Sequence, residues 1–460
     1  MTSPGPELWS SLQLAQRLLS NGQRREAFGV ACKLAITDYE RADWNDALGT
    51  LFTYCEDPER ALRFFERAVD LMPTHPGYQY NLATAQRMLG FFPAAETTLD
   101  TVIALNPGDA DAYYIRSDLR TQTPDKNHVR QLRHLLQSPL ESAPKEIMLR
   151  FALGKELEDL ERYDEAFQNF KRGCELERGR MRYSVSDDVA TLDALIEYHD
   201  SSALSRHSSQ ESDKCIFVVG LPRTGTTLVE RILGGHSKVI PIGESPAFAA
   251  ETVRAIRTRF GRSFPKLELA RRALEIDAHT LGGDYLHAAS PPLAEDQRFL
   301  DKQPLNYLYL GLIRRALPSA RLIVVVRDPL DTCFALYKTL FTGAYPFSYD
   351  FGDLANYYAA WVRLIRHWKS CIGEDLFVVN YEDLVKSPEP VTRALLQHCG
   401  LAWESGILDF HNQRAPVTSA SAVQVRRPLY ISSVGRWRSY AAHLTTLRQL
   451  LEQQNVPLRE

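Results

Sequence analysis

One segment, residues 215–233, limits the folds open to this chain more than any other. Its first five residues are apolar, without the polar alternation of a strand that has one face in water. Gly220 and Gly225 then bracket a short loop, and the residues from Thr226 onward have helical spacing. A buried strand, a glycine-bounded loop and a helix form an anion cradle, because the loop amides and the positive helix end point at one place. The segment therefore predicts an α/β fold with an anion site at the end of a strand.

The loop nearly spells the GxxxxGK[ST] pattern of nucleotide triphosphatases, but Thr226 occupies the lysine position of that pattern. The cation lies instead inside the loop, at Arg223. The loop therefore predicts an anion ligand other than a magnesium nucleotide triphosphate. A nucleotide-dependent kinase, which would share the strand, loop and helix, is disfavoured for this reason. No magnesium-binding aspartate partner is evident in the sequence.

The region around this segment alternates between apolar strands and amphipathic helices. It follows a polar, serine-rich stretch at 201–212 that is typical of a linker or surface loop. Strands are expected at the short apolar runs 215–219, 239–242, 321–326 and 376–380. Such alternation predicts a parallel sheet covered by helices, with ligands at the carboxyl ends of its strands.

The first 180 residues or so have a different pattern, which indicates helical repeats. Pro73 and Pro107 lie 34 residues apart and close similar units, and small residues recur within them, such as Gly49, Ala61, Ala83 and Ala95. This period matches the tetratricopeptide repeat, in which small residues let two helices approach closely. The unit at 113–137 is degenerate, so four or five helical hairpins are expected; an unrelated helical bundle is the alternative. Such solenoids usually bind a peptide or protein.

The loop after the first strand resembles the phosphosulfate-binding loop of sulfotransferases, in the Pro-Arg-Ser/Thr-Gly-Thr-Thr form of the tyrosylprotein branch. The whole chain resembles bacterial proteins that join tetratricopeptide repeats to such a domain. The resemblance implies an α/β protein in three parts: an α-helical tetratricopeptide-type solenoid at 1–180, a linker region at 181–212, and a P-loop-like parallel-sheet sulfotransferase domain at 213–460. It also implies that 3′-phosphoadenosine 5′-phosphosulfate (PAPS) is the cosubstrate.

Sulfuryl transfer needs a polyanion cradle, a base for the acceptor proton and a cation for the leaving phosphate. The resemblance implies that Glu244, which lies 19 residues after Gly225, is the base. His236 is the alternative base, although its position after the loop helix favours a helix C-terminal interaction. Lys302, in a Leu-Asp-Lys-Gln-Pro segment, matches the family lysine that binds the bridging oxygen. The cradle consists of Arg223, Thr224, Gly225, Thr226 and Thr227, with Arg223 neutralising the 5′-phosphate.

The remaining donor contacts follow later strands. Arg327 matches the family arginine that grips the 3′-phosphate, for which a guanidinium suits bidentate contact. The family serine eight residues further on is Ala335 here, so a hydroxyl donor worth roughly 1.5–3 kcal/mol is missing. Weaker donor binding is expected, and an inactive relative is conceivable.

Three further residues complete the expected donor site. Tyr381 matches the tyrosine near the adenosine, and Ser421 resembles the serine at the phosphosulfate end. Arg436 is a further cation for the 3′-phosphate, but Arg426 and Arg427 fit that role equally well.

Composition and charge disfavour several classes of protein, among them nucleic-acid-binding, zinc-binding and membrane-spanning proteins. The net charge of −3 gives no case for nucleic acid as a partner, although residues 410–451 contain no Asp or Glu and suit a polyanionic ligand. The seven cysteines are scattered without CxxC spacing, which predicts neither a zinc site nor disulfides. The N-terminus lacks signal-peptide features, and no apolar run is long enough to span a membrane. A cytoplasmic protein is therefore expected.

The resulting hypothesis is a PAPS-dependent sulfotransferase that modifies an acceptor hydroxyl without a metal. Tyrosine in a peptide or protein held by the repeats is one acceptor; a carbohydrate, a lipid and a small phenol remain open, as does a homodimer. The alternative is a repeat scaffold with weak or no catalysis that binds adenosine bisphosphate.

Overall fold

The computed structural model describes residues 5–20, 22–36, 40–137, 142–204, 212–412, 426 and 431–458. The chain divides into two compact units. One consists of Met1–Glu177 with Asn412–Arg426, and the other of Arg178–His411 with Arg427–Glu460. The first unit thus includes a segment from the C-terminal part of the sequence.

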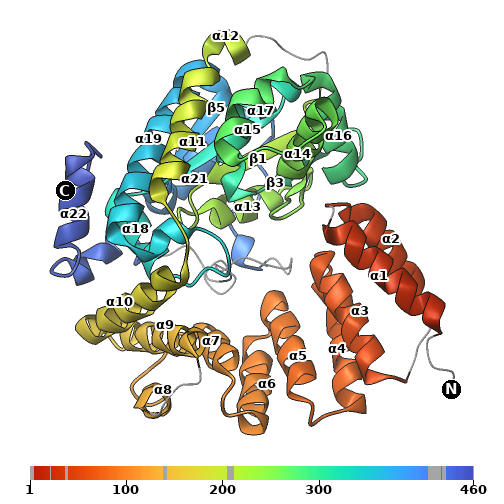
Figure 1. The fold of residues 1–460 in the computed structure, drawn as a ribbon, viewed down its shortest axis with the longest axis vertical. Helices are drawn as coiled ribbons and strands as arrows, with labels where there is room; N and C mark the ends of the chain where they lie inside the picture. The colour runs from red at the N-terminus through yellow and green to blue at the C-terminus, as the bar shows by residue number, and fades with distance from the viewer. Residues whose placement is uncertain are drawn as a thin grey trace. The chain divides into compact units, whose positions relative to one another are not determined.

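The first unit is a succession of helices that pack as neighbouring pairs (Figure 1). Among the described residues these helices are α1 (Pro6–Ser20), α2 (Arg24–Leu34), α3 (Ala42–Tyr54), α4 (Pro58–Leu71), α5 (Pro76–Leu89), α6 (Phe92–Leu105), α7 (Ala110–Asp118), α8 (Val129–Gln137), α9 (Ala143–Asp159) and α10 (Tyr163–Arg180). The predicted solenoid is confirmed. The degenerate unit corresponds to the two nine-residue helices α7 and α8.

Small residues explain how the helices of a pair approach closely. A Cβ atom on Gly49 of α3 would lie 2.6 Å from the ring of Phe65 on α4. A Cβ atom on Gly154 of α9 would lie 2.7 Å from the ring of Phe170 on α10. The same type of glycine–phenylalanine contact therefore allows the two helices to pack closely in two separate hairpins of the array.

The second unit is built on a parallel sheet in the order β2-β3-β1-β4-β5. Its strands are β1 (Cys215–Gly220), β2 (Val239–Pro241), β3 (Arg298–Asp301), β4 (Arg321–Val326) and β5 (Leu376–Asn380). The predicted parallel sheet is confirmed, but β3 was not among the expected strands. It has only four residues with a charge at each end, so its apolar run is too short to stand out.

Helices and short 3₁₀ segments surround this sheet (Figure 1). The helices among the described residues are α11 (Val185–Tyr198), α12 (Ser201–Leu204), α13 (Thr226–Gly234), α14 (Ala247–Phe260), α15 (Lys266–Arg272), α16 (Ala278–Ala289), α17 (Leu310–Ala316), α18 (Pro329–Tyr337), α19 (Phe351–Ile372), α20 (Tyr381–Lys386), α21 (Pro388–His398) and α22 (Thr445–Gln453). The region expected to be a linker, 181–212, differs from expectation because it contains α11 and α12. Leu192 and Leu195 are buried, and α11 packs on α15 and α19 of this unit.

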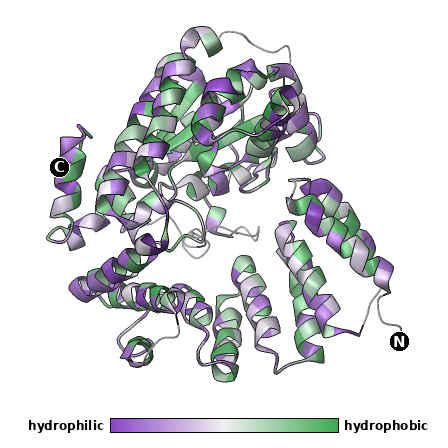
Figure 2. Ribbon diagram, in the orientation of Figure 1, coloured by the Kyte–Doolittle hydropathy of each residue, from purple (hydrophilic) through white to green (hydrophobic). Residues whose placement is uncertain are grey.

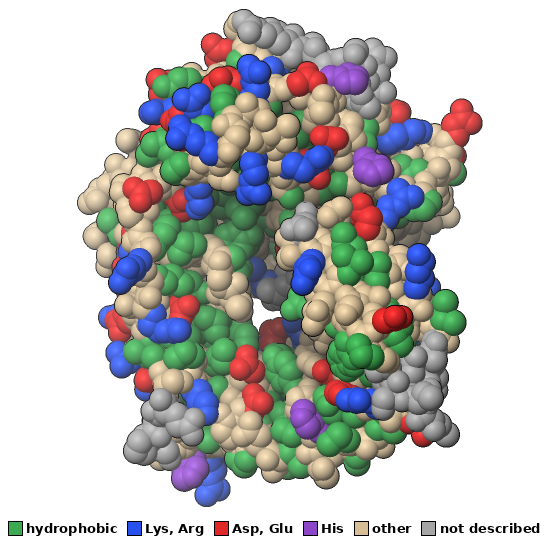
Figure 3. Space-filling model, turned by 45° about the vertical axis from the view of Figure 1, so that its right-hand side comes forward, with side chains coloured by type: hydrophobic (Ala, Val, Ile, Leu, Met, Phe, Trp, Pro, Cys, Tyr) green, Lys and Arg blue, Asp and Glu red, His purple; other side chains and the backbone are tan. Residues whose placement is uncertain are grey.

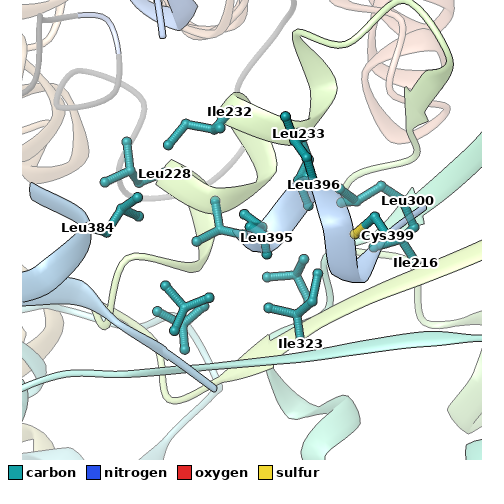
Figure 4. Close-up of a cluster of buried hydrophobic side chains, with 14 of the residues drawn as sticks. Ile216, Leu228, Ile232, Leu233, Leu300, Ile323, Leu384, Leu395, Leu396 and Cys399 are labelled. Atoms are coloured by element: carbon teal, nitrogen blue, oxygen red, sulfur yellow. The ribbon is translucent and has the colours of Figure 1, made fainter. Parts of the chain in front are cut away.

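Both faces of the sheet are covered, which explains why the middle residues of its strands are apolar (Figure 2). Ile216 and Val218 point to one face, where they join a buried cluster with side chains of α13 and α21 (Figure 4). Phe217 points to the other face, 5.5 Å from the ring of Tyr285 and 6.3 Å from that of Phe248. This core fixes the strand ends that carry the site.

The surface is of mixed charge. Acidic and basic side chains are interspersed over the face seen in Figure 3, as the net charge of −3 suggests. Within the described ranges, no helix is both long and apolar enough to cross a membrane.

Candidate active site

All five strands are parallel, so their carboxyl ends meet at one edge of the sheet. Each strand is followed at this edge by a residue or loop that the sequence marked as functional: the loop 221–227 after β1, Glu244 after β2, Lys302 after β3, Arg327 after β4 and Tyr381 after β5. The topology thus brings together residues that are up to 160 positions apart in the chain.

The loop between β1 and α13 needs its glycines for space and for backbone conformation. Gly225 has φ 104°, and a Cβ atom there would lie 2.5 Å from the ring of Tyr381. A Cβ atom on Gly220 would lie 2.7 Å from the carbonyl oxygen of Val325. Arg223 also has a positive φ, 68°, which costs a non-glycine residue energy and is a frequent feature of functional loops.

The threonines of the loop are buried and differ in what they do. The hydroxyl of Thr224 donates to the carbonyl oxygen of Leu221 at 2.7 Å, so it braces the loop from inside. Thr226 and Thr227 begin the nine-residue helix α13. The backbone N–H groups of this first turn have no partner within the helix, which makes the end of α13 suited to an anion.

Lys302 follows β3 at the carboxyl edge, and 2% of its side chain is exposed. Its Nζ contacts Oε1 of Glu244 and lies 3.6 Å from Oε2 of Glu230 on α13. Burial by itself lowers the pKa of the Lys302 amine, but the charges of Glu230 and Glu244 outweigh burial and leave the pKa raised. Lys302 is therefore a buried ammonium with two carboxylate partners.

Strand pairing that continues past the ends of β2 and β3 sets this geometry. The amide of Ile242 donates to the carbonyl oxygen of Leu300 at 2.9 Å, and the amide of Lys302 donates to that of Gly243 at 3.0 Å. These two bonds hold Glu244, the next residue after Gly243, beside Lys302.

Arg327 is held from several sides at the end of β4. Its guanidinium donates to the carbonyl oxygens of Arg223, at 3.0 Å, and Ser433, and it lies 4.9 Å above the ring of Tyr381. The Tyr381 hydroxyl is 2.6 Å from the hydroxyl of Ser433. Only 9% of the Arg327 side chain is exposed, and its Nε has no hydrogen-bond partner among the described residues. A buried donor of this kind fits an anionic ligand.

Asp331, on α18, was not singled out from the sequence. Its fully buried carboxylate accepts from the amides of Gly435, at 2.6 Å, and Trp437, at 3.0 Å, and lies 3.8 Å from Arg327. These bonds bring the backbone of Arg436 to α18. The available signal was an acidic residue four positions after Arg327 in an otherwise apolar helix.

The other expected residues fall elsewhere. Ser421 and Arg427 lie outside the described residues. Arg426 belongs to the first unit, where it donates to the carbonyl oxygen of Met88 at 3.0 Å. Ala335 is buried on α18.

His236 precedes β2 and therefore lies at the amino edge of the sheet, away from Glu244. Its ring Nε2 is 3.0 Å from the carbonyl oxygen of Ala402, instead of capping α13. This position disfavours His236 as the alternative base.

A second residue that the sequence did not reveal is Tyr345. It has φ 53°, and its ring lies 4.8 Å from that of Phe341 and 6.2 Å from that of Phe347. Burial, and then the negative charge of Glu244, raises the pKa of Tyr345. Phe347 in turn stacks on Tyr357 at 3.7 Å. An aromatic cluster thus lies near the carboxylate of Glu244.

The edge offers cations and hydrogen-bond donors, as an anionic ligand requires. The described residues contain no group of three or more His, Cys, Asp or Glu side chains arranged to hold a metal ion.

Comparison with known families finds one match in each unit. Residues 215–405 match the model of the "Sulfotransferase family", and residues 56–119 match that of the "Tetratricopeptide repeat". The chain therefore carries a sulfotransferase domain together with tetratricopeptide repeats, as the sequence predicted.

Among curated proteins, an "Uncharacterized protein" of Aquifex aeolicus is 30% identical over 406 residues, which is 85% of this chain and 52% of that protein. "Protein-tyrosine sulfotransferase 1" of Danio rerio is 24% identical over 241 residues, 48% of this chain and 65% of the fish protein. The match thus spans about half of the first relative and less than two thirds of the second. The solved "Sulfotransferase Domain from the Curacin Biosynthetic Pathway" is 15% identical, covers 54% of this chain and 100% of its own, and has a TM-score of 0.38.

Proposed function

We propose that this protein is a PAPS-dependent sulfotransferase that moves a sulfuryl group to an acceptor hydroxyl. One observation carries the proposal: the contact between the buried ammonium of Lys302 and the carboxylate of Glu244, at the same edge of the sheet as the Arg223 loop. A base and a cation for the leaving group are needed together in sulfuryl transfer, and they are neighbours here.

The donor would bind across the ends of β1, β4 and β5. The amides of the loop and the first turn of α13 suit the 5′-phosphosulfate, together with Arg223, Thr226 and Thr227. The 3′-phosphate would accept from Arg327, whose buried Nε has no partner within the described parts of the chain. Tyr381 would lie against the nucleoside. Ser421 and Arg436 remain proposed donor contacts.

In the transfer step, Glu244 accepts the proton of the acceptor hydroxyl as its oxygen attacks sulfur. A bond forms between the acceptor oxygen and sulfur, and the bond from sulfur to the bridging oxygen breaks. The electron pair stays on that oxygen, and adenosine 3′,5′-bisphosphate leaves. Lys302 and Arg223 stabilise the charge that develops on the leaving phosphate.

A tyrosine in a peptide or protein is the acceptor that we favour. The aromatic cluster around Tyr345 near Glu244 suits a phenol ring. Tetratricopeptide solenoids commonly bind peptides, so the repeats would hold the acceptor protein. The repeats would also be the natural site for a homodimer contact.

The test is transfer of labelled sulfate from PAPS to tyrosine peptides, phenols and glycans by the full chain. Glu244→Gln keeps the shape of the side chain but removes the base, so kcat should fall roughly 10²–10⁴-fold. The matched control is Glu251→Gln on α14, where the carboxylate pairs with Arg254. Equal rates in the wild type and Glu244→Gln would contradict the assignment of the base.

Ala335 favours a second candidate, a scaffold that binds adenosine 3′,5′-bisphosphate without turnover. The missing hydroxyl removes one donor to the 3′-phosphate. Thermal stabilisation by the bisphosphate with no transfer to any acceptor would support the scaffold. No stabilisation at millimolar bisphosphate would contradict the donor assignment of both candidates.

A further inference from the structure

Burying the carboxylate of Glu230 costs free energy, and the proposed reaction gives this residue no role that would account for the cost. Glu230 lies on α13 four residues after Thr226, and only 13% of its side chain is exposed. Its helix neighbours Leu228, Val229 and Ile232 are part of the hydrophobic cluster on the sheet. Removing a carboxylate from water here costs free energy unless a partner compensates it.

The partner is Lys302, whose Nζ lies 3.6 Å from Oε2 of Glu230. The same Nζ also contacts Glu244, so one ammonium serves two carboxylates. Burial raises the pKa of the Glu230 carboxyl; the charge of Lys302 opposes this rise and that of Glu244 adds to it. One carboxylate would be enough to balance the charge of Lys302. The presence of a second carboxylate beside it therefore needs an explanation.

We infer that Glu230 is a positioning residue that acts through Lys302, holding the ammonium in place while Glu244 gives up its role as counterion. The inference rests on the proposed function. In the transfer step Glu244 gains a proton and becomes neutral, so it no longer balances the charge of Lys302. Glu230 keeps its negative charge and still does.

The geometry also leaves Lys302 free to act. An ammonium has three N–H donors, so one can remain on Glu230 while the others reach the bridging oxygen. Glu230 belongs to the helix whose first turn forms the donor cradle. It thereby ties the lysine on the β3 end to the loop that would hold the phosphosulfate.

The test is a double-mutant cycle between Glu230→Gln and Lys302→Ala in the full chain. Glu230→Gln should lower kcat roughly 10- to 100-fold, because a small displacement of a catalytic group has effects of this size. The KM for PAPS and the Kd for adenosine 3′,5′-bisphosphate should change less than about twofold, since Glu230 is not proposed to contact the donor. In the Lys302→Ala background, Glu230→Gln should cost no further activity.

A merely structural role would give a different pattern. If Glu230→Gln leaves kcat unchanged, or lowers it by the same factor with and without Lys302, the inference is overturned. Unchanged bisphosphate binding by Glu230→Gln is the check that the variant is folded. Glu251→Gln serves again as the control and should leave kcat and KM unchanged.

If the proposed function itself is wrong, the experiment gives a third and distinguishable result. In that case the wild type transfers sulfate to no acceptor, and the cycle is measured on urea unfolding instead. Non-additive changes of the unfolding midpoint would support the Glu230–Lys302 contact independently of activity. Additive changes would overturn it.

Discussion

The two edges of the parallel sheet are both rich in charged side chains, but they pair those charges differently. At the amino edge, Arg298 pairs with Asp213 at 2.9 Å, and Lys238 pairs with Asp296 at 3.0 Å. Lys238 and Asp296 are 48% and 63% exposed, so water shares their charges. At the carboxyl edge, Lys302 and Arg327 are 2% and 9% exposed.

This difference shows that burial, more than the number of charges, marks the candidate site. The amino edge also has a cavity of about 340 Å³, lined by charged residues that include Lys238, Arg298 and Glu404. Exposed ion pairs of this kind contribute only about 0–1 kcal/mol. Buried charges cost far more, and a protein retains them where they serve a purpose or are well compensated.

Within the comparison of the two edges, the largest difference is expected when a lysine of each edge is replaced by alanine. Lys302→Ala removes the buried cation proposed for the leaving group and should lower kcat roughly 10²–10³-fold. Lys238→Ala at the amino edge should leave kcat within about twofold, because its ion pair is solvated. Steady-state sulfate transfer measures both. If the two variants lose the same activity, the comparison of the edges fails.

A buried titratable group whose hydrogen-bond partner is a neutral backbone oxygen provides the next contrast. His199, in the second unit, is 1% exposed, and burial lowers its pKa to about 4, with only the Ala270 carbonyl oxygen at 2.9 Å opposing the shift. The unfolded chain therefore binds more protons than the folded one between about pH 6.5 and 4. The free energy of unfolding should fall by about 3 kcal/mol as the pH drops through this window.

Urea unfolding at pH 7 and pH 5 checks this expectation. His199→Gln keeps a donor for the carbonyl oxygen of Ala270 but cannot take up a proton, so its stability should depend less on pH. A pH dependence identical to that of the wild type would assign the effect to other groups.

The smallest effect is expected for the arginines of the two edges. Arg327→Ala should weaken adenosine 3′,5′-bisphosphate binding roughly 10- to 100-fold, because hydrogen bonds to charged groups are worth about 1.5–3 kcal/mol. Arg298→Ala at the amino edge should leave the Kd unchanged. Isothermal titration calorimetry measures both constants. Equal Kd values for the two variants would exclude Arg327 from the donor site.

Local patterns predicted much of this architecture. The 34-residue period indicated the repeats because each hairpin packs with its own small residues, such as Gly49 against Phe65. The apolar run before Gly220 indicated a strand buried on both faces. The strand β3 was not predicted from the sequence because four residues show little periodicity. Helix α11 was not predicted because it adjoins a polar stretch.

The candidate site divides in the same way. Glu244, Lys302 and Arg327 each follow a strand, and parallel topology brings strand ends to one edge whatever lies between them. Their catalytic roles remain predictions. Glu230 and Asp331 were not predicted, because each contacts a segment distant in the sequence. Tyr345 was not predicted either, because only the folded chain brings it within the electrostatic influence of Glu244.

The sequence by itself determined the repeat array, the strand–loop–helix and the order of the candidate residues, since these depend on neighbours a few positions apart. Only the tertiary structure decided that one lysine lies between two carboxylates and that Asp331 binds the segment before Trp437. Glu230 and Lys302 are 72 positions apart, and Asp331 and Trp437 are 106 apart. Contacts of that range depend on strand register and helix packing, which no local pattern encodes.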